Sequence, residues 1–230
     1  MTENQDKMPE PDIDDAIDAT MRGLAKSVPV VGPVLDEVFS FVERPISIRK
    51  RKWLESIARR LTRLEEEVKD FKIANLSNNP VFISSFLTAI TIAIRTHQPE
   101  KLDALKNAII NSALPNPPNE DLQLIFLNLI DTFTPWHIRI LKFYQDPKRW
   151  FKEKGQNPVY RGNSAQSLIG AFPDLRSNRS LYEQIITDLN IRGLLSLDKT
   201  TLNVGMTEYG LDESRTTELG NAFLQFITFV

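Results

Sequence analysis

The chain has 230 residues, enough for one large domain or for two small ones with their own cores. Hydrophobic residues make up 41% and charged residues 25%, a composition that excludes a disordered chain. The absence of cysteine excludes disulfides and thiolate metal sites, and it favours a reducing, cytoplasmic location. The acidic N-terminus is unlike a signal peptide, and the longest apolar run, 81–94, is too short for a transmembrane helix.

Two stretches of opposite charge near the N-terminus are hidden by the net charge of −2. Residues 1–18 contain seven acidic residues and one lysine, whereas residues 44–63 contain eight basic residues and one glutamate. Such stretches can pair with each other or bind separate partners. Residues 1–11, with two prolines, are predicted to be a disordered lead-in.

Two short helices are expected before residue 45. The first covers about residues 12–26, and the second is amphipathic and should end before Pro45. Five apolar side chains repeat at helical spacing in the second: Val34, Leu35, Val38, Phe39 and Val42. Four consecutive bases follow: Arg49, Lys50, Arg51 and Lys52. Together they could lie on an anionic membrane surface. In the simpler alternative, the apolar residues pack on a helical bundle and the bases face water.

A heptad-like seam marks the next helix. Its apolar residues are spaced by three or four positions: Trp53, Ile57, Leu61, Leu64, Val68 and Phe71. Antiparallel pairing of two copies would place the basic start of each helix against the acidic end of the other, and we expect such a homodimer. The alternative is that the seam packs on the 81–95 helix of its own chain.

A helix is predicted at 81–95, and because it is apolar nearly all round it should be central. Further helices are predicted from residue 99, at 122–133 and from Pro135, where Thr134 can cap the helix. Residues 146–163 are expected to be a loop. Helices at 164–172, 180–192 and 217–229 follow, with Gly193 as a cap and short strands at 194–197 and 202–207 joined by a turn. The predicted fold is therefore mainly α: a multi-helix bundle over 12–133 and a winged-helix-like module over 134–230 with one small β-hairpin.

Residues for catalysis are scarce. The two histidines, His97 and His137, have no second nitrogen or sulfur ligand at useful spacing, and a structural role is expected for both. The nine glycines form neither a phosphate-binding loop nor a dinucleotide fingerprint, and no serine has a nucleophile-elbow context. The sequence therefore predicts no metal, no cofactor and no small-molecule substrate, and a protein that is not an enzyme.

The winged-helix-like module offers a possible nucleic-acid contact at the start of the helix that precedes the predicted hairpin: Arg176, Asn178 and Arg179. However, residues 181–230 contain seven acidic and three basic residues, and the whole of 134–230 contains ten acidic and twelve basic residues. Nucleic-acid binding usually needs a stronger basic footprint. Contact with another protein, or a purely structural role, is therefore preferred for this module.

The order of features resembles the bacterial abortive-infection-alpha family of phage-conflict proteins. Four stretches carry the resemblance: 28–35 (VPVVGPVL), the basic helix 49–64, 125–144 (IFLNLIDTFTPWHIRILKFY) and 217–224 (TELGNAFL), the last following Gly193-Leu194-Leu195. These touch about a third of the chain, and they supply no catalytic residues to carry over. The resemblance implies a part in antiviral growth arrest or cell suicide.

The expected function is accordingly a non-enzymatic antiviral-defence effector or adaptor. It would act through protein–protein contacts or as a peripheral protein on the inner-membrane surface, using the 30–42 and 44–63 segments. A winged-helix nucleic-acid-binding regulator and a structural subunit of a larger complex are the alternatives.

Overall fold

The computed structural model describes residues 32–69, 71–158 and 161–228, with the backbone alone for 32–46 and Tyr209. The chain divides into two compact units, 1–51 and 52–230. The predicted lead-in and the predicted helix at 12–26 lie outside the described residues, as do the side chains of Val34, Leu35, Val38, Phe39 and Val42. The described part is mainly helical with one small antiparallel sheet, which confirms the predicted class at this level.

Helix α2 runs without interruption from Gly32 to Glu67. The prediction that a helix ends before Pro45 is therefore wrong. A proline inside a helix removes one backbone hydrogen bond and costs about 3 kcal/mol, which kinks or breaks a helix only where nothing offsets it. Here the segment after Pro45 is rich in arginine, lysine, leucine and glutamate, which favour helix, and it buries an apolar seam from Trp53 onward.

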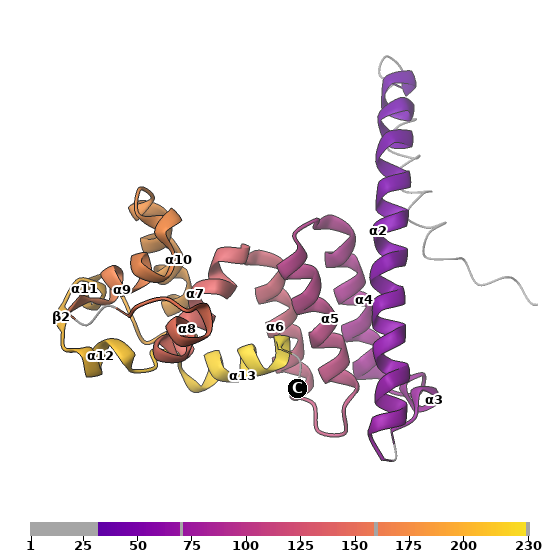
Figure 1. The fold of residues 1–230 in the computed structure, drawn as a ribbon. Helices are drawn as coiled ribbons and strands as arrows, with labels where there is room; N and C mark the ends of the chain where they lie inside the picture. The colour runs from indigo at the N-terminus through magenta and orange to yellow at the C-terminus, as the bar shows by residue number, and fades with distance from the viewer. Residues whose placement is uncertain (1–31, 70, 159–160, 229–230) are drawn as a thin grey trace, which may run out of the picture. The chain divides into compact units, whose positions relative to one another are not determined.

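The bundle helices begin where prolines and caps predict. Helix α4 (Pro80–Arg95) and helix α5 (Pro99–Ala113) have proline at their first position, and Asn79 and Asn119 cap α4 and helix α6 (Glu120–Thr132) through their side chains. Figure 1 shows α4, α5 and α6 side by side, in mutual contact. From Trp53 on, α2 packs against this layer together with the short helix α3 (Ile73–Leu76). The Trp53 indole donates a hydrogen bond to the Leu102 carbonyl of α5 at 3.0 Å.

Helix α4 is less central than predicted. Its inward face consists of Phe82 and Ile92 with small residues, Ser85, Ala89 and Ala93, which allow close approach of α5 and α6. Two of its large apolar side chains, Ile83 and Leu87, are about 40% exposed. The buried face is therefore chosen by the fit of small side chains, and not by hydrophobicity alone.

Residues 135–228 form short helices around a two-stranded sheet. In chain order they are α7 (Pro135–Gln145), α8 (Pro147–Lys154), β1 (Gly162–Asn163), α9 (Ser164–Ala171), the 3₁₀ turn η1 (Pro173–Leu175), α10 (Arg179–Ile191), α11 (Lys199–Leu202), β2 (Gly205–Met206), α12 (Glu208–Asp212) and α13 (Glu218–Ile227). The predicted loop at 146–163 is partly wrong, because α8 occupies 147–154. Asp146 caps it through a hydrogen bond from the Arg149 N–H, and Gly155 ends it in the left-handed conformation.

The predicted hairpin between 194–197 and 202–207 is also wrong. Asp198 accepts hydrogen bonds from the N–H groups of Thr200 and Thr201, so the expected turn becomes the first turn of α11. The strand residues pair elsewhere. Strand β2 is antiparallel to β1, which precedes α9 in the chain, and Leu195 forms an isolated bridge with Thr216.

Helix α13 connects the bundle helices with the C-terminal helices. It packs on α5 and on α7, and Phe126 of α6 contacts the rings of Phe223 and Phe226. One apolar core consequently extends from Trp53 to Ile227. The predicted domain boundary at residue 134 lies inside this unit and remains a prediction.

Candidate functional site

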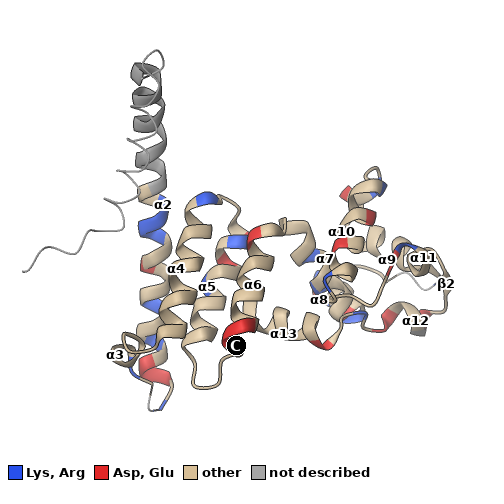
Figure 2. Ribbon diagram, turned by 180° about the vertical axis from the view of Figure 1, so that it is seen from behind, with Lys and Arg blue, Asp and Glu red and all other residues tan. Residues whose placement is uncertain are grey.

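The predicted basic surface lies on α2. Of the four consecutive bases, Arg51 and Lys52 are exposed, whereas Arg49 and Lys50 are half-buried. Two turns further on, Arg59 and Arg63 are exposed as well. Lys52, Arg59 and Arg63 are spaced by seven and four positions, which places them on one face of the helix. Figure 2 shows basic residues along the described part of α2 and acidic residues at its C-terminal end.

The three bases Lys52, Arg59 and Arg63, called here the basic face of α2, are not neutralised by ion pairs with described residues. No ion pair joins any of the three to a described residue, whereas their neighbour Arg60 is half-buried and pairs with Glu67 at 3.3 Å. Exposed cations produce a positive potential that reaches about a Debye length, roughly 8 Å at physiological salt. The exposed Glu55 and Glu66, three or four positions from these bases, reduce that potential and leave a net positive charge on this face. The basic face is therefore available to a negatively charged partner.

The opposite face of the same helix is the predicted self-association seam. Trp53, Ile57, Leu61, Leu64 and Phe71 are buried inside the chain, and the partly buried Val68 packs against them. Leu61, near the middle, is 8% exposed. The seam thus contributes to the core of its own chain, in line with the intramolecular alternative. A homodimer remains a prediction.

The predicted nucleic-acid contact is exposed but weakly charged. Arg176, Asn178 and Arg179 lie together at the turn that precedes α10. The Arg179 guanidinium pairs with Glu183 at 2.6 Å, and the Asn178 amide donates to the Asp174 carbonyl. Arg176 alone of the three is left to face a phosphate, so this turn gives little support to a nucleic-acid interface.

Two segments on which the family resemblance rests are in direct contact. The Thr217 hydroxyl donates to the Gly193 carbonyl at 2.5 Å, and the Thr217 N–H donates to the Leu194 carbonyl at 3.1 Å. Gly193 has a φ of +71°, as expected of a residue that ends a helix. The turn after α10 and the start of α13 therefore form one structural unit, although 24 positions separate them in the chain.

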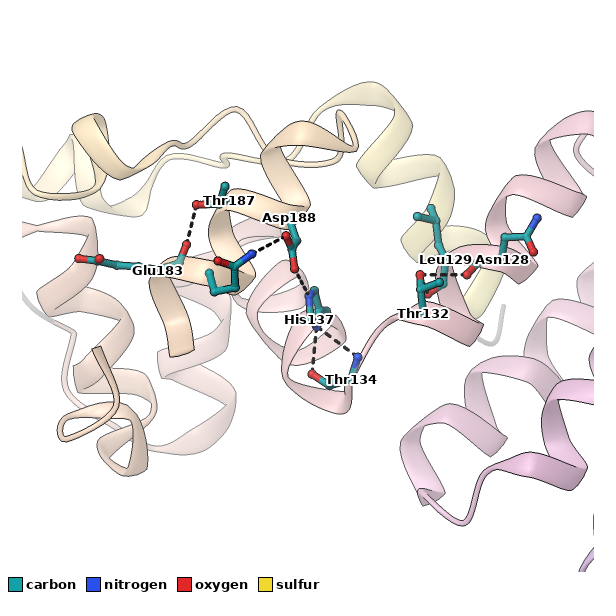
Figure 3. A network of polar contacts seen from close by, with 9 residues as sticks. Asn128, Leu129, Thr132, Thr134, His137, Glu183, Thr187 and Asp188 are labelled. Atoms are coloured by element: carbon teal, nitrogen blue, oxygen red, sulfur yellow. Dashed lines mark hydrogen bonds and ion pairs between the residues drawn. The ribbon is translucent and has the colours of Figure 1, made fainter. Parts of the chain in front are cut away.

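A polar network around His137 connects the start of α7 with α10 (Figure 3). The Thr134 backbone N–H donates to His137 Nδ1 at 3.2 Å, and the Thr134 hydroxyl lies 2.9 Å from the same nitrogen. On the other side, His137 Nε2 lies 3.5 Å from Asp188 Oδ2. Because Nδ1 accepts from a backbone N–H, the proton of the neutral ring must reside on Nε2 and point to Asp188.

The surroundings of this ring favour its neutral form. His137 is buried and stacks on Phe133 with 4.6 Å between ring centroids. Burial lowers its pKa below the ordinary value, Asp188 opposes this effect, and Arg192 and Lys101 add to it. Lys101 is itself buried, and its ammonium donates to the Asp131 carbonyl at 2.8 Å.

Thr134, His137 and Asp188 supply a hydroxyl, an imidazole and a carboxylate, the groups that many hydrolases use. Their connections differ from those of a catalytic set. A backbone N–H and a hydroxyl share the single lone pair of Nδ1, so this nitrogen is not free to take up the hydroxyl proton. The network is better described as a joint between α7 and α10. The structural role predicted for His137 agrees with its burial, whereas Asp188, 51 positions away, gave no signal in the sequence.

A shallow pocket of about 710 Å³ lies beside the sheet. It is lined by residues of β1, the start of α9 and β2 that the sequence did not single out: Arg161, Gly162, Asn163, Gln166, Asn203, Gly205, Met206, Thr207 and Glu208. The Asn163 and Gln166 side chains already bond each other's backbone as a capping box. These polar groups are thus engaged in holding the helix.

The described residues contain neither a metal-binding cluster nor a membrane-spanning helix. They contain no cluster of three or more histidine, aspartate or glutamate side chains placed to hold a metal ion. Within the same residues, no helix combines the length and apolar content that a bilayer span requires.

Comparison with known proteins found no matching family model, no matching curated protein and no matching solved structure.

Proposed function

We propose that the protein is a non-enzymatic effector or adaptor of antiviral defence that binds an anionic partner through the basic face of α2. One observation carries the binding proposal: Lys52, Arg59 and Arg63 are exposed on one face of a helix whose other face is anchored in the core. The part in defence is supported by the resemblance to the abortive-infection-alpha family.

An anionic inner-membrane surface is the form of partner that we propose. Each lysine or arginine near an anionic bilayer contributes about 1 kcal/mol of attraction. The three bases span eleven positions, roughly 16 Å of helix, so one face can contact several headgroups at once. Three such contacts predict weak, reversible and salt-sensitive attachment, as suits a peripheral protein.

Vesicle flotation tests the proposal. The wild type is expected to float with vesicles that contain phosphatidylglycerol and to stay behind with purely phosphatidylcholine vesicles. The triple variant Lys52→Glu, Arg59→Glu, Arg63→Glu should lose flotation, because each reversal replaces attraction with repulsion. A matched control, Lys152→Glu, Arg161→Glu, Arg176→Glu, makes the same change in net charge at exposed positions elsewhere and should float like the wild type.

The same variants separate the two parts of the proposal. In cells challenged with phage, protection should require the three bases of α2 and not the three control bases. A wild type that never floats, but whose protection still depends on the α2 bases, would move the proposal from lipid to an acidic protein surface. A chain that gives no protection against any phage tested would remove the part in defence.

We also propose that residues 134–230 form a winged-helix-like module used for protein contact. Support comes from the order of elements, in which α7, α9 and α10 precede the wing-like segment with β2, and α13 closes the module. The exposed side of α10 carries Leu181 and the 76% exposed Ile191, together with the acidic Asp188. Apolar and acidic groups on this helix suit a protein surface better than a phosphate backbone.

A further inference from the structure

The short connection between α6 and α7 carries the chain from the bundle into the C-terminal helices. It consists of Phe133 and Thr134, and both touch His137. Phe133 stacks on the imidazole, and Arg192 of α10 lies 5.5 Å from the centre of the Phe133 ring. Thr134 directs its backbone N–H and its hydroxyl at Nδ1. The imidazole therefore holds this connection to the first turn of α7, together with the His137 backbone N–H, which donates to the Thr134 carbonyl at 3.0 Å.

A proton on the ring would undo half of this arrangement. Nδ1 can accept the Thr134 N–H only while it is unprotonated. In the imidazolium both nitrogens are donors, so Nδ1–H would donate to the Thr134 hydroxyl oxygen 2.9 Å away, and the Thr134 N–H would lose its acceptor. The Nε2 contact to Asp188 would survive and gain charge. Protonation thus releases the Thr134 N–H, while the hydroxyl contact and α10 stay in place.

Charged groups from each neighbouring element set how readily the proton binds. From α10, Asp188 favours the imidazolium, but its side chain is 38% exposed and lies at 3.5 Å, so water weakens the attraction. Also from α10, Arg192 opposes it, as does Lys101 from α5. Asp131 of α6 contributes its carbonyl to Lys101, and its carboxylate binds Arg95 instead.

We propose that His137 is a proton-sensitive latch on the α6–α7 connection: neutral, it holds the Thr134 backbone N–H, and protonated, it releases that N–H. The sign follows from the direction of the pKa shift. A ring whose pKa is lower in the folded chain stabilises the fold above its ordinary value of about 6.5, and this contribution is lost as pH falls below that value. The latch is closed at neutral pH and opens under mild acid. This inference does not depend on the proposed function.

Nuclear magnetic resonance can follow the latch directly, since the chain has only two histidines. In the His97→Gln variant, the remaining imidazole signal belongs to His137 and should titrate with a midpoint below 6.5. Across that midpoint, the protection factor of the Thr134 amide should fall by about fivefold to tenfold, the equivalent of one net hydrogen bond. The Ile185 amide, in the middle of α10, should keep its protection.

Two variants keep the test decisive. Glutamine at this third helical position can accept the Thr134 N–H in a capping box but does not titrate, so His137→Gln should protect the Thr134 amide at both pH values. Arg192→Gln removes an opposing charge and should raise the midpoint. A midpoint at or above 6.5, a Thr134 amide indifferent to pH, or a glutamine variant with the pH response of the wild type would each overturn the latch.

Discussion

Gly220 lies where α13 meets the turn that follows α10, and its missing side chain lets the two backbones touch. A Cβ at this position would stand 2.1 Å from the Leu194 carbonyl oxygen, which is backbone and cannot turn aside. Gly220→Ala should therefore destabilise the chain by about 2–3 kcal/mol in urea unfolding. Gly205→Ala is the matched control, since its Cβ would meet nothing within 4 Å, and equal losses for both would contradict the close approach.

Single residues were predictable from sequence where their role is local. Thr134 before Pro135 and Gly193 after α10 mark helix ends through their own backbone preferences, and the structure confirms both positions. The same signal was present and missed at Asp146-Pro147, followed by Gly155, which bounds α8. Asp188 was not predictable as the partner of His137, because nothing local links residues 51 positions apart.

The C-terminal end of α13 is held by side chains that are distant in the sequence. The Asn107 amide of α5 donates to the Ile227 carbonyl at 3.0 Å. The Asn111 amide of α5 donates to the carbonyls of Gln225, Phe226 and Thr228, at 3.2, 2.7 and 3.0 Å. The Gln225 carbonyl also accepts the Thr228 N–H at 3.4 Å, whereas the Phe226 carbonyl is buried at the end of the helix, where carbonyls lack an intrahelical donor. Asn111 itself is buried. Asn111→Leu should lower the free energy of unfolding by about 2–3 kcal/mol, because it leaves the buried Phe226 carbonyl without its donor.

Limited proteolysis can localise that loss. If Asn111 anchors α13, the Leu variant should be cleaved at its C-terminal helix under conditions that leave the wild type intact. Asn128→Leu on the exposed side of α6 serves as the control and should change stability by no more than about 0.5 kcal/mol. A stability loss without faster cleavage of α13 would show that Asn111 acts elsewhere.

Helix positions were predictable to a greater extent than contacts between elements. Periodicity, prolines and caps located α4 to α7, α9, α10 and α13. The sheet was not predictable, since β1 and β2 are two residues each, lie far apart in the chain and leave no alternating pattern. The exposed side of α4 was equally hidden, because small inward residues decide it, and their value depends on the neighbouring helices.

At the scale of the whole molecule, α2 contributes both a buried apolar seam and an exposed basic face, and its sequence shows both patterns. The seam at every third or fourth position and the bases between its members were both visible in advance, and the structure buries the first and exposes Lys52, Arg59 and Arg63. Whether the seam would meet its own chain or a second copy could not be decided from spacing, because both solutions satisfy the same periodicity. The intramolecular packing leaves the basic face as the outward surface of this helix.

A charge placed in the seam should unfold the chain. Leu61 is 8% exposed within its own chain, so Leu61→Glu places a carboxylate in the core and should cost about 3–5 kcal/mol, enough to unfold much of the population. Leu87→Glu on α4 introduces the same charge at a 43% exposed leucine and should stay folded. Circular dichroism reports folding, and sedimentation equilibrium reports mass. A Leu61→Glu chain that stays folded but halves in mass relative to a dimeric wild type would show that the seam joins two copies instead.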